Sequence, residues 1–128
     1  MPRAILIVED AEQYASVLEI AFQAIADVKV VHAFTGRQAL EYLNSGGTPE
    51  VSALVTDLQM PVMDGFELIE QVRSMPRWAR LPIVVISGDT NPETPDRLKR
   101  LGADAYFTKP YSPGEVRKKV EELLNAGR

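Results

Sequence analysis

Short runs of apolar, β-branched residues alternate along this chain with segments whose apolar residues recur at helical spacing. This alternation limits the possible folds more than any other feature of the sequence. The runs are Ile5–Val8, Val28–Ala33, Ala53–Thr56, Pro82–Ser87 and Ala105–Thr108. Continuous apolar runs of this length are typical of strands buried on both faces. Since a predicted helix follows each run, we expect an α/β fold of five βα units, with helices on both faces of a parallel sheet.

The predicted helices have recognisable apolar faces or ends. An apolar stripe marks the first helix: Tyr14, Val17, Leu18, Ala21, Phe22 and Ile25. Capping signals predict the others over about Gly36–Leu43, Gly65–Ser74, Thr94–Leu101 and Pro113–Asn125, with Asp64 as a structural cap and Gly102 as a terminator. A loop is predicted at Gly46–Pro49.

Length and composition narrow the class of protein. The chain has 128 residues, no cysteine and one histidine, so we expect one domain, residues 1–128, without disulfides, a thiolate nucleophile or a cysteine-ligated metal. We expect the single histidine, His32, to be a packing or surface residue. The longest clean apolar run, Ala4–Val8, is far shorter than the about 20 residues of a membrane span. It also does not have the form of a signal peptide. A cytoplasmic protein that does not enter a membrane is therefore expected.

The net charge of −4 hides an asymmetry between the two halves of the chain. Residues 1–64 carry 3 basic and 9 acidic side chains, whereas residues 65–128 carry 11 basic and 9 acidic ones. Such a split is typical either of a surface that binds polyanions or of acids gathered at one site and bases on another surface. Composition alone leaves both interpretations open.

Charged and hydroxyl side chains follow four of the five predicted strands. Glu9 and Asp10 come after the first strand, Asp57 ends the third, and Ser87 and Lys109 follow the fourth and fifth. Because ligands of open parallel sheets bind outside the carboxyl ends of the strands, we expect these side chains to gather at one edge. Two carboxylates about 4 Å apart repel by roughly 4 kcal/mol at an effective dielectric constant of about 20. The acids therefore require a counter-charge.

The residue types at this edge suit phosphoryl transfer. Oxygen ligands without histidine or cysteine favour Mg²⁺ or another hard cation. Such a cation and Lys109 can neutralise phosphoryl oxygens while the Ser87 hydroxyl donates a hydrogen bond. Asp57 is the candidate nucleophile, because carboxylates form acyl phosphates. The chain contains no G-x-x-x-x-G-K-[ST] sequence, which excludes a P-loop nucleotide site.

Six short motifs resemble those of the receiver, or phosphoacceptor, domain of two-component response regulators, the CheY-like family. They are Ile5-Leu6-Ile7-Val8-Glu9-Asp10, Val55-Thr56-Asp57-Leu58-Gln59-Met60-Pro61, Met63-Asp64-Gly65, Ile86-Ser87-Gly88, Gly102-Ala103-Asp104 and Lys109-Pro110. Each is weak alone, but all six in this order and spacing are highly specific, and the likeness covers essentially the whole chain. The resemblance implies a flavodoxin-like fold with strand order 2-1-3-4-5. It also implies a phosphorylation-dependent signalling switch in a two-component system or phosphorelay, not a turnover enzyme.

The same resemblance implies roles for the acidic residues. Asp57 would accept a phosphoryl group from the phosphohistidine of a sensor histidine kinase or phosphotransfer protein. Asp10, Asp57 and the backbone carbonyl of Gln59 would ligate Mg²⁺ (or Mn²⁺) directly. Glu9 would act through a metal-bound water; it stands where many members have Asp, which is a mild departure.

The resemblance also implies a switch. Ser87 and Lys109 would hold the phosphoryl oxygens, and Tyr106 would change its rotamer when Ser87 moves inward. The Lys109-Pro110 peptide would be cis, a property mostly of X-Pro bonds. Gln59 and Asp89 stand at positions that vary in the family and tune the lifetime of the phosphate.

Several alternatives remain open at this stage. The basic clusters of the last two helices are either solvated faces or, within residues 95–125, a surface for an output partner or a homodimer. Direct nucleic-acid binding is not expected, because the chain is acidic and carries no recognised DNA-binding motif. Trp78 is read as a loop anchor, although an exposed Trp78 would indicate a partner contact.

Three other functions compete with the switch. A pseudo-receiver would bind partners without phosphate chemistry, and Asp57, Ser87 and Lys109 argue against it. A flavodoxin needs a hydroxyl-rich loop where this chain has Glu9-Asp10-Ala11. An aspartate-nucleophile phosphatase needs a second acid at the position of Gln59.

Overall fold

The structure is a computed structural model that describes residues 3–46 and 50–126. Strands and helices alternate along the described residues, as the sequence pattern predicts. They are β1 (Arg3–Val8), α1 (Glu12–Phe22), β2 (Val28–Ala33), α2 (Gly36–Asn44), β3 (Val51–Asp57), α3 (Gly65–Ser74), the 3₁₀ turn η1 (Pro76–Trp78), β4 (Ile83–Ser87), α4 (Thr94–Leu101), β5 (Ala105–Thr108) and α5 (Pro113–Asn125). Residues 47–49 of the predicted Gly46–Pro49 loop lie outside the described residues.

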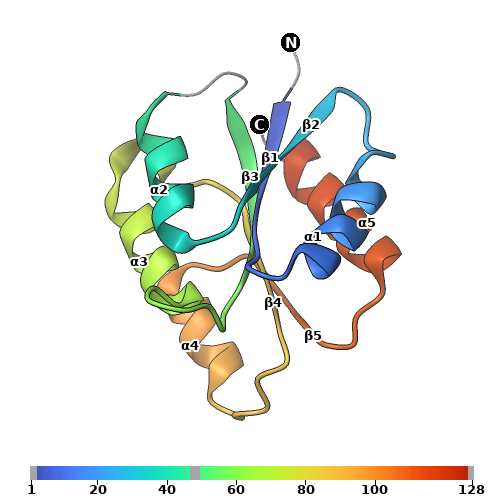
Figure 1. The fold of residues 1–128 in the computed structure, drawn as a ribbon. Helices are drawn as coiled ribbons and strands as arrows, with labels where there is room; N and C mark the ends of the chain where they lie inside the picture. Colours follow the sequence, from blue (N-terminus) through green and yellow to red (C-terminus); the bar gives the residue numbers. More distant parts are fainter. Residues whose placement is uncertain (1–2, 47–49, 127–128) are drawn as a thin grey trace.

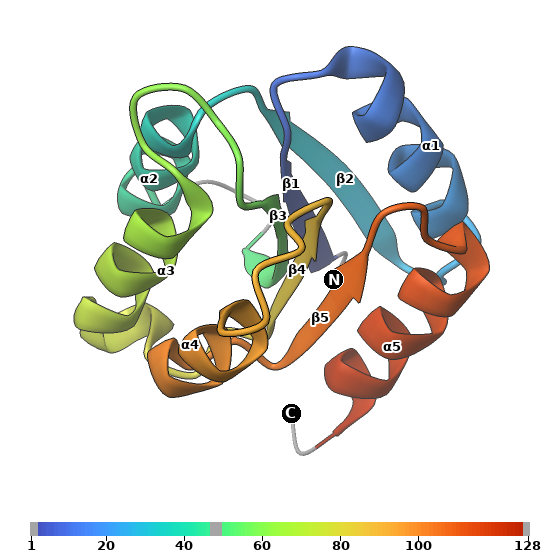
Figure 2. The ribbon, with the colours of Figure 1, turned by 90° about the horizontal axis from the view of Figure 1, so that it is seen from below.

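The five strands form one parallel sheet in the order β2-β1-β3-β4-β5. Helices α2, α3 and α4 cover one face of the sheet, and α1 and α5 cover the other (Figures 1 and 2). This three-layer arrangement is the flavodoxin-like α/β fold, and it confirms the predicted fold class and strand order.

Each face of the sheet has its own apolar core. Leu6, Leu54 and Val85 point to the α2–α3–α4 side, whereas Ile5 and Val84 point to the α1–α5 side. Alternate residues of a strand face opposite sides, so a strand covered on both faces must be apolar at every position. This explains the continuous apolar runs of the sequence.

The predicted apolar stripe of α1 is wrong in part. Leu18 and Phe22 are buried, as is Ile25 just beyond the helix, but Tyr14 is 45% exposed and Val17 is 42% exposed. The buried face of the helix is instead centred on Ala15, Leu18 and Phe22. Apolar residues occupy two adjacent rows of this helix, and the sheet and α5 cover only one of them. Periodicity alone does not identify which row is covered.

The predicted helix caps are confirmed. The Thr35, Asp64 and Ser112 side chains accept hydrogen bonds from the backbone N–H of the residue three positions later, at 3.0, 2.9 and 3.3 Å. Gly102 ends α4 with φ +99°, a left-handed conformation that glycine adopts without strain. Trp78 is 5% exposed and packs in the α2–α3–α4 core, so it is an anchor. Within the described ranges, no helix is long and apolar enough to cross a membrane.

Candidate functional site

Strand register gathers the predicted site residues at the carboxyl edge of the sheet. Val8 of β1 pairs with Thr56 of β3, which places Glu9 beside Asp57. Along β4, Ile86 pairs with Asp57 and Ser87 pairs with Thr108. The next residue of the chain, Lys109, therefore emerges beside Ser87, and its backbone N–H donates to the Ser87 carbonyl at 2.9 Å.

Lys109 lies between two buried carboxylates. Glu9 is 4% exposed and Asp57 is 7% exposed. The Lys109 ammonium is 2.9 Å from Asp57 Oδ2 and 3.8 Å from Glu9 Oε1. The Tyr14 ring lies under the same ammonium, 4.5 Å from the ring centroid. The structure thus brings Glu9, Asp57 and Lys109 together, and it adds an aromatic neighbour that sequence reasoning assigned to the core.

Backbone groups hold the two carboxylates in place. The N–H of Gln59 donates to Asp57 Oδ1 at 3.1 Å, and the N–H of Ala11 donates to Glu9 Oε2 at 3.1 Å. Behind Asp57, the N–H of Gly65 donates to the Leu58 carbonyl at 2.8 Å. A Cβ on Gly65 would lie 2.5 Å from the Asp57 carbonyl oxygen. The structure therefore gives Gly65 a role in positioning Asp57 that the capping pattern did not indicate.

The charges of this edge are not balanced. Burial, opposed in part by the Ala11 N–H and reinforced by the charge of Asp57, raises the pKa of Glu9 to about 7. Burial alone would lower the pKa of Lys109, but its hydrogen bond to Asp57 and the charges of Asp57 and Glu9 raise it overall. Burial is the main cause of the raised pKa of Glu9, and the single ammonium of Lys109 faces both carboxylates. An additional cation at this edge would favour the charged form of Glu9.

Asp10 differs from its neighbours because it is exposed, at the rim of the edge. Across residues 3–46 and 50–126, no three acidic, histidine or cysteine side chains converge as a ready-made metal cluster. Mg²⁺ is usually bound by one or two carboxylates and keeps several waters. The carboxylates of this edge and its unbalanced negative charge therefore fit such an ion.

Ser87 joins a hydrogen-bonded network centred on Asp89. Ser87 is fully buried, and its hydroxyl oxygen accepts the Asp89 N–H at 3.0 Å. The Tyr106 hydroxyl donates to the Asp89 carbonyl at 3.2 Å. The Thr94 hydroxyl, at the start of α4, donates to Asp89 Oδ2 at 2.7 Å. Sequence reasoning gave Asp89 a role only in phosphate lifetime, whereas the structure connects it to both predicted switch residues and to α4.

The remaining predicted residues fall into structural roles. A ring nitrogen of His32 lies 2.8 Å from the Glu9 carbonyl, and the ring packs 4.1 Å from that of Phe34. The Lys109–Pro110 peptide is cis, as the resemblance implies.

Arg97 of α4 and the basic side chains of α5 contact other side chains of the domain. The Arg97 guanidinium stacks 3.8 Å from the Phe66 ring. On α5, each basic side chain pairs with a glutamate one turn away: Arg117 with Glu121, Lys118 with Glu115, and Lys119 with Glu122. These intrahelical pairs favour the interpretation that the basic face of α5 is solvated.

Comparison with known proteins agrees with this geometry. The sequence model of the response regulator receiver domain matches residues 5–121. The two-component response regulator ORR11 of Oryza sativa subsp. indica is 29% identical over 123 residues, covering 96% of this chain and 82% of the rice protein.

Solved structures that resemble this chain include response regulators. The Francisella response regulator 1452 receiver domain superposes with a TM-score of 0.86 at 26% identity, and the match covers 100% of both chains. The Mn²⁺-bound form of response regulator Rcp1 has a TM-score of 0.82 at 23% identity, covers 99% of this chain and 98% of its own, and shows the shared fold. This chain belongs to the response regulator receiver domain family, the CheY-like domains of two-component signalling.

Proposed function

We propose that residues 1–128 form one receiver domain that works as a phosphorylation-dependent switch, with Asp57 as the phosphoacceptor. The observation that carries this proposal is the position of the Lys109 ammonium, 2.9 Å from the buried Asp57 carboxylate at the edge where Ser87 also lies. The phosphodonor would be the phosphohistidine of a sensor histidine kinase or phosphotransfer protein. Receiver domains are generally not turnover enzymes, and this one would assist only its own phosphorylation and dephosphorylation.

The chemistry is an in-line displacement at phosphorus. An Asp57 carboxylate oxygen forms the new O–P bond while the N–P bond of the phosphohistidine breaks, and its electron pair stays on the imidazole. Negative charge on the equatorial phosphoryl oxygens is neutralised by Lys109, and the Ser87 hydroxyl donates to one of them. The Gln59 N–H fixes one carboxylate oxygen at 3.1 Å, so Asp57 is already oriented.

Receiver domains typically bind Mg²⁺ or Mn²⁺. We propose that Asp10, Asp57 and the Gln59 backbone carbonyl would hold the ion here, with Glu9 acting through a bound water. When bound, the ion would supply the positive charge that this acidic edge lacks and would neutralise phosphoryl oxygens. The shared position of the Glu9 and Asp57 carboxylates supports this assignment, because only one ammonium, that of Lys109, faces both of them.

The switch would run through the hydrogen bonds of Asp89. If Ser87 turns toward a phosphoryl group, its hydroxyl leaves the Asp89 N–H, to which it is bonded at 3.0 Å. Asp89 also holds the Tyr106 hydroxyl and the Thr94 hydroxyl of α4. Release of the first bond therefore loosens the other two, which shifts the population of a pre-existing second state. The surface that changes lies within residues 95–125, where an output partner or a second copy would bind.

Labelling with a small acyl phosphate tests the proposal. The wild-type protein, incubated with radiolabelled acetyl phosphate and Mg²⁺, should incorporate about one phosphoryl group per chain. Asp57→Asn should abolish incorporation. Asp64→Asn is the matched control, since Asp64 is an exposed helix cap in the loop after β3, and it should label like the wild type.

Two outcomes would contradict the assignment. Labelling that persists in Asp57→Asn would place the acceptor elsewhere. Complete failure of the folded wild-type protein to label would favour a pseudo-receiver, which binds partners without phosphate chemistry.

A further inference from the structure

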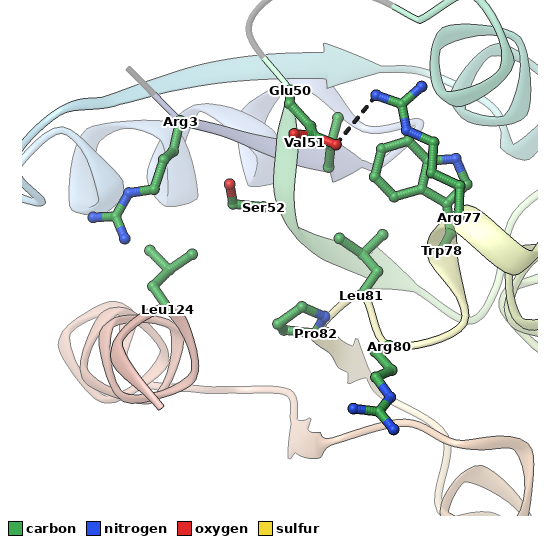
Figure 3. Close-up of a pocket in the computed structure, with 10 residues that line it drawn as sticks. All are labelled: Arg3, Glu50, Val51, Ser52, Arg77, Trp78, Arg80, Leu81, Pro82 and Leu124. Atoms are coloured by element: carbon green, nitrogen blue, oxygen red, sulfur yellow. Dashed lines mark hydrogen bonds and ion pairs between the residues drawn. The ribbon is translucent and has the colours of Figure 1, made fainter. Parts of the chain in front are cut away.

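A hollow lies at the amino ends of the strands (Figure 3), whereas Asp57 ends β3 at the opposite, carboxyl edge of the sheet. Its walls come from the first residues of β1 and β3, from the connection between η1 and β4, and from the last turn of α5. Its volume is about 300 Å³, at the lower end of the range for ligand sites in proteins. Neither the phosphoacceptor chemistry nor the switch uses this region.

The floor of the hollow is apolar and fixed. Leu81, Val51 and Leu124 line it, and all three are buried parts of the domain core or its edge. Backbone hydrogen bonds hold the strand starts together: the Leu54 N–H donates to the Pro82 carbonyl at 2.9 Å. A surface formed by core residues does not have to reorganise when a partner side chain covers it.

Three arginines surround this apolar floor: Arg3, Arg77 and Arg80. Figure 3 shows that they stand on different sides of the hollow, with Arg3 beside Leu124, Arg77 beside Trp78 and Arg80 beyond Pro82. One acid, Glu50, lies among them. The hollow therefore carries a net positive charge, although the whole chain has a net charge of −4.

Arg77 is held in position by two side-chain contacts, and a ligand could replace one of them. Its guanidinium stacks 4.7 Å from the centroid of Trp78, a buried side chain, and pairs with Glu50 at 3.1 Å. The two charged side chains of that pair are 51% and 67% exposed. Solvent-exposed pairs of this kind contribute little stability, so a carboxylate from a partner can replace Glu50 readily.

On the other side of the hollow, two polar groups are available. Among the described residues, neither the Arg3 guanidinium nor the Ser52 hydroxyl has a side-chain hydrogen bond or ion pair. Both belong to strand starts, and Figure 3 shows them on the same side of the hollow. Together they provide a cationic donor and a hydroxyl donor for one incoming carboxylate.

We propose that this hollow, defined by Arg3, Ser52, Arg77, Arg80, Leu81 and Leu124, binds an acidic peptide segment of a partner protein. One apolar side chain of the segment would cover Leu81 and Leu124, and flanking carboxylates would pair with the arginines. Arginines on separate sides require separate carboxylates, which a single small anion does not provide. The apolar floor and Glu50 also disfavour a nucleic-acid backbone. Buried apolar contacts ringed by charge pairs are the usual arrangement of a specific protein interface.

Trp78 makes the site directly observable, because it is the single tryptophan of the chain and packs under Arg77. The probe is the capped peptide acetyl-Asp-Glu-Leu-Glu-Asp-amide. We expect it to change Trp78 fluorescence with a millimolar or tighter Kd that weakens as salt is raised. Amide chemical shifts should change at residues 50–52 and 76–82. The neutral peptide acetyl-Asn-Gln-Leu-Gln-Asn-amide, and succinate as a small dicarboxylate, should each bind at least about tenfold more weakly.

Charge-reversal variants locate the site. Arg80→Glu and Arg3→Glu should each weaken acidic-peptide binding by about tenfold or more, whereas Arg100→Glu, the same change on the exposed face of α4, should leave it unchanged. Asp57→Asn should also bind like the wild type, which separates this site from phosphoacceptor chemistry. The proposal is overturned if the acidic peptide leaves Trp78 and residues 50–52 unperturbed at millimolar concentration. Equal binding of succinate, or equal loss in Arg100→Glu, would likewise overturn it.

Discussion

At the scale of single residues, Lys109 is the positive charge that two buried carboxylates share. Its ammonium lies within 2.9 Å of one buried carboxylate and 3.8 Å of another. In the proposed reaction the same charge would face the transferred phosphoryl group. Lys109 therefore pairs with both carboxylates of the resting site and, in the proposed reaction, would stabilise the transition state.

Lys109→Gln should slow labelling of Asp57 by acetyl phosphate about a hundredfold or more, because removal of one preorganised donor at a developing charge has an effect of this size. The measurement is the initial rate of phosphoryl incorporation at saturating Mg²⁺. Lys119→Gln, on α5, is the control and should keep the wild-type rate. An unchanged rate in Lys109→Gln would remove Lys109 from the proposed chemistry.

Gly65 is a second residue that determines the local structure, because the close approach of the neighbouring backbone leaves no room for a side chain. A Cβ there would meet the backbone of Asp57 at 2.5 Å and of Leu58 at 2.8 Å. Since neither backbone atom can move without displacing the end of β3, Gly65→Ala should lower the free energy of unfolding by about 1–3 kcal/mol.

Urea unfolding measures this change, and the same substitution elsewhere provides the control. Gly114 lies in α5, and its nearest atom would be 3.8 Å away from an added Cβ. Gly114→Ala should therefore be neutral or stabilise the protein by up to about 1 kcal/mol, because alanine favours helix. Equal effects of the two substitutions would show that the close approach at Gly65 has no energetic consequence.

At the scale of elements, α4 is a short helix with two buried side chains. It has eight residues, of which Thr94 and Leu98 are buried. Its two ends are fastened by polar contacts: Asp89 accepts from Thr94 at the start, and Arg73 donates to the Gly102 carbonyl at the end, at 2.6 Å from Nη2. Loss of one of those contacts would free the corresponding end of the helix to shift.

The pKa of Asp89 reports the first of these contacts. The Asn91 N–H and then the Thr94 hydroxyl lower the pKa of Asp89 below its ordinary value of 3.8. A depressed pKa means that the carboxylate favours the folded state above the ordinary value and that this contribution is lost as the pH falls through the depressed value.

Carboxyl ¹³C NMR titration should therefore give a pKa below 3.8 for Asp89 in the wild-type protein. In Thr94→Val the pKa should rise part of the way toward the ordinary value, because the Asn91 N–H remains. Thr90→Val, at an exposed neighbouring position, is the control and should not move it. No difference between the two variants would contradict the link between Asp89 and α4.

At the scale of the whole molecule, the two ends of the sheet carry opposite charge. The carboxyl edge gathers Glu9, Asp10 and Asp57, and the amino edge carries Arg3, Arg77 and Arg80. The three acids all come from the acidic half of the sequence, whereas the three arginines come from both halves.

Mg²⁺ should stabilise the folded domain as a whole, because the acidic edge exists only in the native state. At a free Mg²⁺ concentration ten times its Kd, the gain is about 1.4 kcal/mol, which is roughly 3–6 °C in Tm for a domain of this size. Calorimetry with and without a chelator, at constant ionic strength, measures it. Asp57→Asn should lose the shift and Asp64→Asn should keep it; a shift retained in Asp57→Asn would refute the proposed ligand set.

Most of the fold could be predicted from local patterns. The apolar runs at residues 5–8 and 53–56 and the caps Thr35 and Ser112 act over a few residues, so the sequence displays them directly. The residues at the carboxyl ends of the strands, such as Asp57 and Lys109, could be predicted from the same local pattern. The strand order did not follow from periodicity and came from the family resemblance.

What escaped prediction depends on contacts between segments that are distant in the sequence. Val17 and Leu18 are both aliphatic residues of α1, and only the position of the helix against the sheet and α5 exposes one and buries the other. Asp89 acquires its partners Tyr106 and Thr94 because β4, β5 and α4 meet there.

The sequence by itself therefore determined the order of the elements, the ends of most helices and the residue types at the carboxyl edge, because each of these depends on neighbours along the chain. Tertiary structure alone decided which α1 row is buried, why Gly65 must be glycine and that Arg3 and Arg80 share one hollow. The physical reason is that packing and register bring together side chains whose separation in the sequence carries no signal.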